Sequence, residues 1–159
     1  MDNLSDDLAA WDAASLRRRE RSLREQALWS TTLPGLFLDA AERGAPVAVV
    51  LRGGAGTRTG VVTVVGADYI GLGDTVLLPF SAIAAVRGAV SGDRDGPADG
   101  LSFAAAVGAL AEEGAEVSTL LDCGESVTGV LRAAADSMVL VDTTWVALDA
   151  VRALQLVVV

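Results

Sequence analysis

Short runs of aliphatic and β-branched residues, separated by turns rich in glycine and aspartate, fill residues 46–88. This alternation predicts strands, because β-branched residues favour pleated structure and Gly-Asp pairs favour tight turns. The expected strands are 47–51, 59–65, 69–72, 76–78 and 83–86. So many short strands in one small segment indicate a highly bent sheet that closes on itself, since closure removes exposed edges.

A weaker copy of the same pattern returns at residues 116–157, and residues 154–159 form an apolar tail. The predicted equivalences are Gly44 with Gly114, Val47 with Val117, Leu51 with Leu121, Gly54 with Gly124, Gly60 with Gly129, Asp68 with Asp136, Ile70 with Met138, Leu72 with Leu140, Phe80 with Trp145, Ile83 with Leu148, and Val86 and Arg87 with Val151 and Arg152. The tail is expected to complete the second barrel or to pair with a neighbour. The repeat predicts a mainly β fold of two tandem small five-stranded barrels.

Three amphipathic patterns predict helices, so that each barrel follows a short helix. The first starts near Asn3 and carries a loose leucine stripe, the second is capped by Thr32 and ends at Gly44, and the third runs over 103–113 after Ser102. Residues 91–100 hold glycine, proline and aspartate and predict a linker. The expected domains are therefore a charged amphipathic helical arm (1–31), a first helix and barrel (32–90), the linker (91–100), and a second helix and barrel (101–159).

The net charge of −9 disfavours general nucleic-acid binding, because phosphate contacts depend on basic side chains. All twelve basic residues are arginine, and Arg17, Arg18 and Arg21 belong to a cluster in the first predicted helix. This cluster is interpreted either as an accessory nucleic-acid surface or as a solvated helix face, since acidic residues are interleaved with it.

Composition argues against an enzyme. The chain has no histidine and a single cysteine, Cys123, which predicts neither an imidazole base nor a zinc site. No phosphate-binding GxxxxGK loop occurs, and Asp68 and Asp136 are interpreted as turn residues. We therefore expect no catalytic residues, no metal and no cofactor. Because neither a secretory signal nor an apolar run long enough to span a bilayer is present, a cytoplasmic protein without membrane contact is expected.

The first strand-rich segment resembles the Sm-like fold family, which includes the Sm, LSm and Hfq proteins. The residues that match its first motif are Val49, Val50, Leu51, Gly54, Gly60, Asp68, Tyr69 and Ile70, and Val86-Arg87-Gly88 is similar to its second motif. An Hfq-like alignment, with strands at 76–80 and 82–86, fits equally well. Two departures concern the RNA pocket: Gly71 and Leu72 stand near the position of an Sm asparagine, and Pro79-Phe80-Ser81 replaces the Tyr-Lys-His triplet of Hfq. The chain also resembles, loosely, uncharacterised actinobacterial proteins with a charged N-terminal helix.

The resemblance implies two divergent Sm-like copies in a non-enzymatic, RNA-associated post-transcriptional regulator of bacterial type. Single-stranded RNA would then contact Asp68 and Tyr69 at one loop and Arg87 and Gly88 at another, with Tyr69 stacking on a base. The alternatives without RNA contact are a partly buried strand aromatic for Tyr69 and an ion pair at the rim for Arg87. The alternative function is a protein–protein assembly module that binds no nucleic acid. Such a module would form a homo-oligomer, or hold a protein partner, through open strand edges and the N-terminal helix.

Overall fold

The computed structural model describes residues 3–29, 31–89 and 100–158, which form three α-helices and ten β-strands. The helices are α1 (Asn3–Trp29), α2 (Leu33–Arg43) and α3 (Phe103–Glu112). The strands are β1 (Pro46–Leu51), β2 (Thr57–Val65), β3 (Tyr69–Leu72), β4 (Val76–Pro79), β5 (Ile83–Arg87), β6 (Glu116–Leu121), β7 (Ser126–Ala134), β8 (Met138–Val141), β9 (Thr144–Ala147) and β10 (Val151–Leu156). The prediction of a β-rich chain with short helices is confirmed; the predicted linker, apart from Gly100, lies outside the described residues.

All ten strands are hydrogen-bonded into one antiparallel open sheet, in the order β5-β1-β2-β3-β4-β10-β6-β7-β8-β9. This differs from the expectation of two separately closed barrels. Each half of the chain nevertheless supplies an unbroken block of five strands, and the two blocks have the same internal order. The blocks join because β4 and β10 would each otherwise leave a row of unpaired backbone groups. The strands β5 and β9 remain as the two outer edges.

Strand pairing confirms the first part of the predicted repeat alignment and corrects the rest. Gly60 lies opposite Val47 in one half and Gly129 lies opposite Val117 in the other, as expected. The next turns are equal in length, since the Gly66 amide donates to the Tyr69 carbonyl much as the Ala135 amide donates to that of Met138. Tyr69 therefore corresponds to Met138, which moves the predicted equivalences at 68–72 by one residue.

The alignment beyond β3 changes further, because the hairpin before the fourth strand is one residue longer in the first half than in the second. A single gap at this hairpin matches β4 with β9 and β5 with β10. The corrected equivalences are Asp68 with Ser137, Ile70 with Val139, Leu72 with Val141, Leu77 with Trp145, Phe80 with Leu148, Ile83 with Val151, Val86 with Leu154, and Arg87 with Gln155. The tail at 154–159 is a separate strand in the prediction, whereas residues 154–156 here are the end of β10.

The caps predicted for the two short helices are present. The Thr32 hydroxyl accepts a hydrogen bond from the Gly35 amide at 3.1 Å, and Gly44 ends α2 with a left-handed φ of +62°. The Ser102 hydroxyl accepts from the Ala105 amide at 3.1 Å and starts α3. Thr32 and Ser102 thus fix where the two helices begin, and Gly44 fixes where α2 ends before β1.

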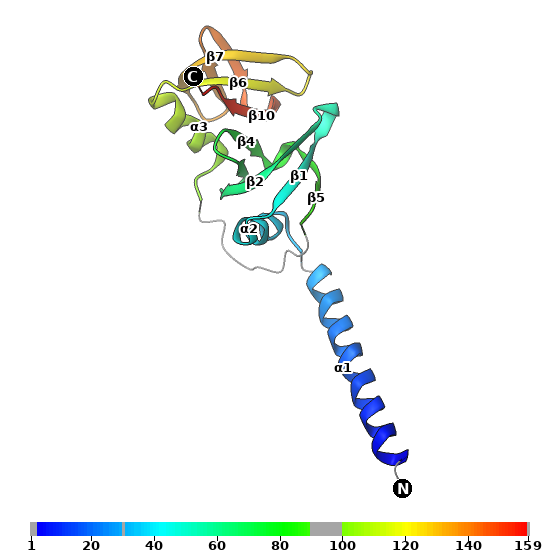
Figure 1. Cartoon of the computed structure of the whole chain (residues 1–159). Coiled ribbons are helices and arrows are strands. Elements are labelled where there is room, and N and C mark those ends of the chain that lie inside the picture. Colours follow the sequence, from blue (N-terminus) through cyan, green and yellow to red (C-terminus); the bar gives the residue numbers. More distant parts are fainter. Residues whose placement is uncertain (1–2, 30, 90–99, 159) are drawn as a thin grey trace.

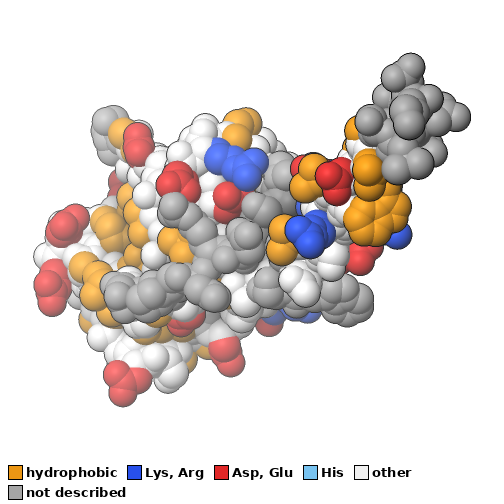
Figure 2. Space-filling view, turned by 90° about the horizontal axis from the view of Figure 1, so that it is seen from below, with side chains coloured by type: hydrophobic (Ala, Val, Ile, Leu, Met, Phe, Trp, Pro, Cys, Tyr) orange, Lys and Arg blue, Asp and Glu red, His pale blue; other side chains and the backbone are white. Residues whose placement is uncertain are grey.

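Helix α1 extends away from the β-rich body (Figure 1). Its described side chains at residues 8–26 are exposed, apart from residues 13–15, which are partly exposed. Hydrophobic, basic and acidic side chains gather along this projecting helix, whereas acidic side chains are scattered over the body on the face that Figure 2 shows. None of the described helices is long and apolar enough to cross a membrane.

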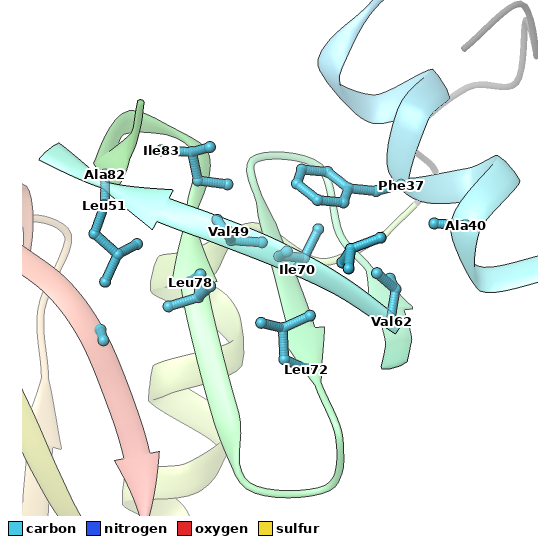
Figure 3. Packing of buried hydrophobic residues seen from close by; sticks show 12 residues of the cluster. Phe37, Ala40, Val49, Leu51, Val62, Ile70, Leu72, Leu78, Ala82 and Ile83 are labelled. Atoms are coloured by element: carbon cyan, nitrogen blue, oxygen red, sulfur yellow. The ribbon is translucent and has the colours of Figure 1, made fainter. Parts of the chain in front are cut away.

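Two hydrophobic clusters form the core, one for each half. In the first, Phe37 of α2 packs over strand residues such as Val49 and Ile70 (Figure 3). The ring of Phe37 also stacks on Phe80, with ring centroids 5.9 Å apart. The second surrounds Phe103 and Val107 of α3. Each cluster also contains residues of the other half. Tyr69 and Leu77 of the first half pack in the second cluster, and Ala153 of the second half packs in the first cluster.

Candidate functional site

The junction of the two halves is a short antiparallel pair between β4 and β10. Leu154 lies opposite Leu77 and Gln155 opposite Val76, and the Leu156 amide donates to the Thr75 carbonyl at 2.7 Å. Leu154 is fully buried there, and Leu77 packs against the second cluster. The fourth strand of the first half (β4) therefore pairs with the fifth strand of the second half (β10) inside one chain.

Asp68 and Tyr69, two of the residues proposed for RNA contact, lie where the first half meets helix α3 of the second half. One carboxylate oxygen of Asp68 accepts a hydrogen bond from the Phe103 amide at the start of α3, at 2.5 Å. A carboxylate at that position satisfies a free helix N–H group and faces the positive end of the helix dipole. Asp68 thus joins the first half to the helix of the second.

Tyr69 is only 6% exposed, and its ring packs on Phe103 with centroids 6.0 Å apart and planes tilted by 55°. Burial raises the pKa of the Tyr69 hydroxyl above its ordinary value of 10.0, and the neighbouring negative charge of Asp68 raises this pKa further. The ring is therefore used in packing and does not offer a face on which a base could stack. Of the two interpretations of Tyr69, the strand aromatic is the one that this geometry supports.

A cavity of about 540 Å³ opens beside the same turn. It is lined by Asp68, Pro79, Phe80, Ser81, Phe103, Ala104, Asp136, Ser137, Met138, Ala147, Leu148 and Asp149. Three of these residues are acidic and none is basic, so the cavity offers no basic side chain to a phosphate group. This cavity is therefore a poor site for a nucleic-acid backbone.

Arg87 and Gly88 lie far along the chain from this turn, at the end of β5. Arg87 is exposed and pairs through its backbone position with Ala48 of β1. Gly88 has a φ of +90°, a left-handed value that favours glycine, and a Cβ atom added there would lie 3.2 Å from the Pro46 carbonyl oxygen. Since β5 is an outer edge of the sheet, Arg87 belongs to a different surface from Asp68 and Tyr69.

Arg17, Arg18 and Arg21 are exposed on α1. The Nε groups of Arg17 and Arg18 donate to the carbonyls of Ala13 and Ala14, one turn earlier in the helix. These contacts hold one edge of each guanidinium group along the helix, while both side chains stay exposed. The structure therefore places the arginine cluster on the projecting arm, apart from both other groups of predicted site residues.

The sequence predicts open strand edges as the contact of an assembly module, and β5 and β9 are the outer strands of the sheet. The residue that sequence reasoning missed is the exposed Trp145 on β9. Trp145 of β9 is 54% exposed, although its equivalent Leu77 packs against the second half of the chain. Its aromatic character and its place in a strand were visible in the sequence. The predicted alignment, however, matched Trp145 with Phe80, which packs in the core, and so hid its position at a free edge.

Among the described residues, no group of three or more potential metal-ligating side chains comes together, and Cys123 is exposed. No family model, curated protein or solved structure matches this chain. The function must therefore be argued from the geometry of the sheet and its edges.

Proposed function

We propose that this protein is a non-enzymatic assembly module, built from two Sm-like units that associate with further copies of the chain through their free edges. The equal strand order of the two halves supports the assignment of two related units. Residues 49–51 and 69–70, which carry part of the Sm-like resemblance, lie in the strands β1 and β3, and this supports the proposal. The observation that carries the proposed function is the exposed Trp145.

The junction inside the chain serves as a template for the contact between chains. Because β4 corresponds to β9 and β5 corresponds to β10, pairing β9 of one copy with β5 of the next repeats the β4–β10 contact. The same register places Trp145 opposite Val86 and Thr144 opposite Arg87. Such a contact removes the exposed tryptophan and the unpaired groups of both edges from water.

This contact joins two different surfaces, so it is head-to-tail and builds either a closed ring or an open filament. Burying most of the Trp145 side chain contributes roughly 2 kcal/mol for each contact. The rest of the free energy of association comes from burial of Val86 and from the new backbone hydrogen bonds between the two edges. On the face of the body that Figure 2 shows, acidic side chains are scattered and the described basic side chains form no cluster, so this face offers no basic patch to a polyanionic partner.

Trp145→Lys tests the proposal directly, because it places a charge on the β9 edge, a device that blocks edge pairing in natural sheets. The mass measured by light scattering after size-exclusion chromatography is expected to fall. Ala85→Lys, at an exposed position of β5, should lower it equally. Leu101→Lys is the matched control, since Leu101 is an exposed leucine outside both edges.

Mixing the two edge variants gives the sharper result. Each variant retains one intact edge, so an equimolar mixture is expected to form a species larger than either variant alone. An unchanged mass in both variants, or a mixture that behaves as the sum of its parts, would contradict head-to-tail edge pairing.

Binding of single-stranded RNA stays a prediction of the Sm-like resemblance, and it is supported only by the exposure of Arg87 and of the arginines on α1. Retention on mixed RNA at low salt, weakened by Arg87→Ala, is the result that it requires. Indifference of the assembly to nuclease, together with no retention on RNA, would leave the assembly module as the sole function.

A further inference from the structure

One face of α1 carries an ordered series of apolar and charged residues. Leu8, Asp12, Leu16, Arg19 and Leu23 are spaced by three or four residues, which places them along a single face of the helix. The three leucines are between 59% and 64% exposed. Trp11 adds a further exposed ring beside them, and this face bears a hollow of about 290 Å³ lined by Trp11, Asp12, Ser15, Leu16 and Arg19.

This face is complementary to itself when two copies are turned antiparallel. If the two-fold axis passes between Ser15 and Leu16, Leu8 of one helix faces Leu23 of the other, and Asp12 faces Arg19. Each contact occurs twice by symmetry, as in any isologous interface. A parallel arrangement in register would instead set Asp12 against Asp12 and Arg19 against Arg19, and like charges at close range disfavour it.

We propose that α1 is a pairing helix, which binds α1 of a second copy in this antiparallel register. Ser15 and Leu16 lie at the middle of the 27-residue helix, so the two helices overlap along most of their length. Because α1 extends away from the body, the two bodies lie at opposite ends of the helix pair (Figure 1). Two leucine layers and two ion-pair layers then hold the copies together, with Leu16 near the centre.

The helix contact and the edge contact are separate surfaces with different symmetry. The edges join copies head-to-tail, whereas α1 joins them two by two, so α1 would link one edge-built assembly to another. The inference does not need the edge contact, and each can fail alone. A variant with a blocked edge isolates the helix contact for measurement.

The test uses the full chain carrying Trp145→Lys, studied by sedimentation equilibrium. This variant is expected to be a dimer in reversible equilibrium with monomer. Adding Asp12→Arg sets like charges against Arg19 in both ion-pair layers, and the dissociation constant should rise about tenfold or more. Arg19→Asp should act alike, whereas an equimolar mixture of the two variants restores opposite charges and should dimerise.

Arg21→Asp provides the matched control, because Arg21 lies on the opposite face of α1 and its charge reversal should leave the dissociation constant unchanged. Circular dichroism at 222 nm checks that α1 stays helical in every variant. A Trp145→Lys chain that is monomeric at every concentration overturns the inference and leaves the edge proposal standing. A dimer that is indifferent to Asp12→Arg and Arg19→Asp overturns the antiparallel register.

Discussion

Gly66 gives the most direct test of how the two halves of the chain are held together. It lies buried in the turn between β2 and β3, where the Ala67 amide donates to the Leu101 carbonyl at 3.0 Å. A Cβ atom at this position would meet the ring of Tyr69 and would lie 2.7 Å from the Leu101 carbonyl oxygen. Gly66 has no left-handed φ, so Gly66→Ala changes only the space that the residue needs.

The cost of this substitution follows from what must move. Tyr69 is packed on Phe103 and Leu101 presents a backbone atom, so neither neighbour yields freely. Overpacking of this kind costs about 1–3 kcal/mol, and we expect the upper part of that range. In a chain of this size each kcal/mol lowers the melting temperature by roughly 2–4 °C, which predicts a fall on the order of 5–10 °C.

Thermal and urea denaturation followed by circular dichroism measure this change. Gly108→Ala is the matched control, since a Cβ there meets only the Ala134 methyl group at 3.9 Å and replaces a glycine within α3. It should raise the free energy of unfolding by about 0.5–1 kcal/mol. If Gly66→Ala proves as stable as the unaltered protein, the packing of the segment before α3 on this turn is wrong.

Three further predictions concern single buried or strained groups. The Thr119 hydroxyl is buried without a hydrogen-bond partner, at the position that Val49 occupies in the first half. Thr119→Val should therefore raise the free energy of unfolding, measured by urea denaturation, by about 1 kcal/mol. A lower free energy of unfolding would show that the hydroxyl has a hydrogen-bond partner. Tyr69 is the single tyrosine, so a pH titration followed by absorbance at 295 nm should give a titration midpoint above pH 10.0. The stability that the neutral Tyr69 hydroxyl contributes is complete below pH 10 and is lost as the pH rises through the raised pKa. The Tyr69→Phe variant should not show this pH-dependent loss of stability. Asp142 has a φ of +51° and its carboxylate accepts a hydrogen bond from the Val130 amide at 3.1 Å, so Asp142→Ala should lower the free energy of unfolding by about 1–2 kcal/mol. If Asp142→Ala and Asp142→Asn have the same melting temperature, this role of the side chain is contradicted.

Local patterns were sufficient to predict most of the elements. The caps at Thr32, Gly44 and Ser102, and the strands of both halves, depend on propensities that act over a few residues, and the structure has them close to the expected bounds. The repeat was predictable for the same reason, as far as Gly60 and Gly129. It failed from residue 68 onward, because it placed a one-residue gap before β3, whereas the difference in length lies in the hairpin before the fourth strand. A one-residue difference in loop length leaves no trace in a pattern with a period of two.

The amino-acid sequence by itself determined a β-rich chain with three helices, a repeated strand pattern and an acidic surface, since each depends on composition or on neighbours along the chain. Only the tertiary structure decided that β4 pairs with β10, that Asp68 and Tyr69 hold α3, and that Trp145 lies at an open edge. These facts depend on which strands meet across long separations in the chain. Every residue except proline offers the same backbone donor and acceptor, so the choice of partner strand is set by the packing of both halves together and not by any local motif.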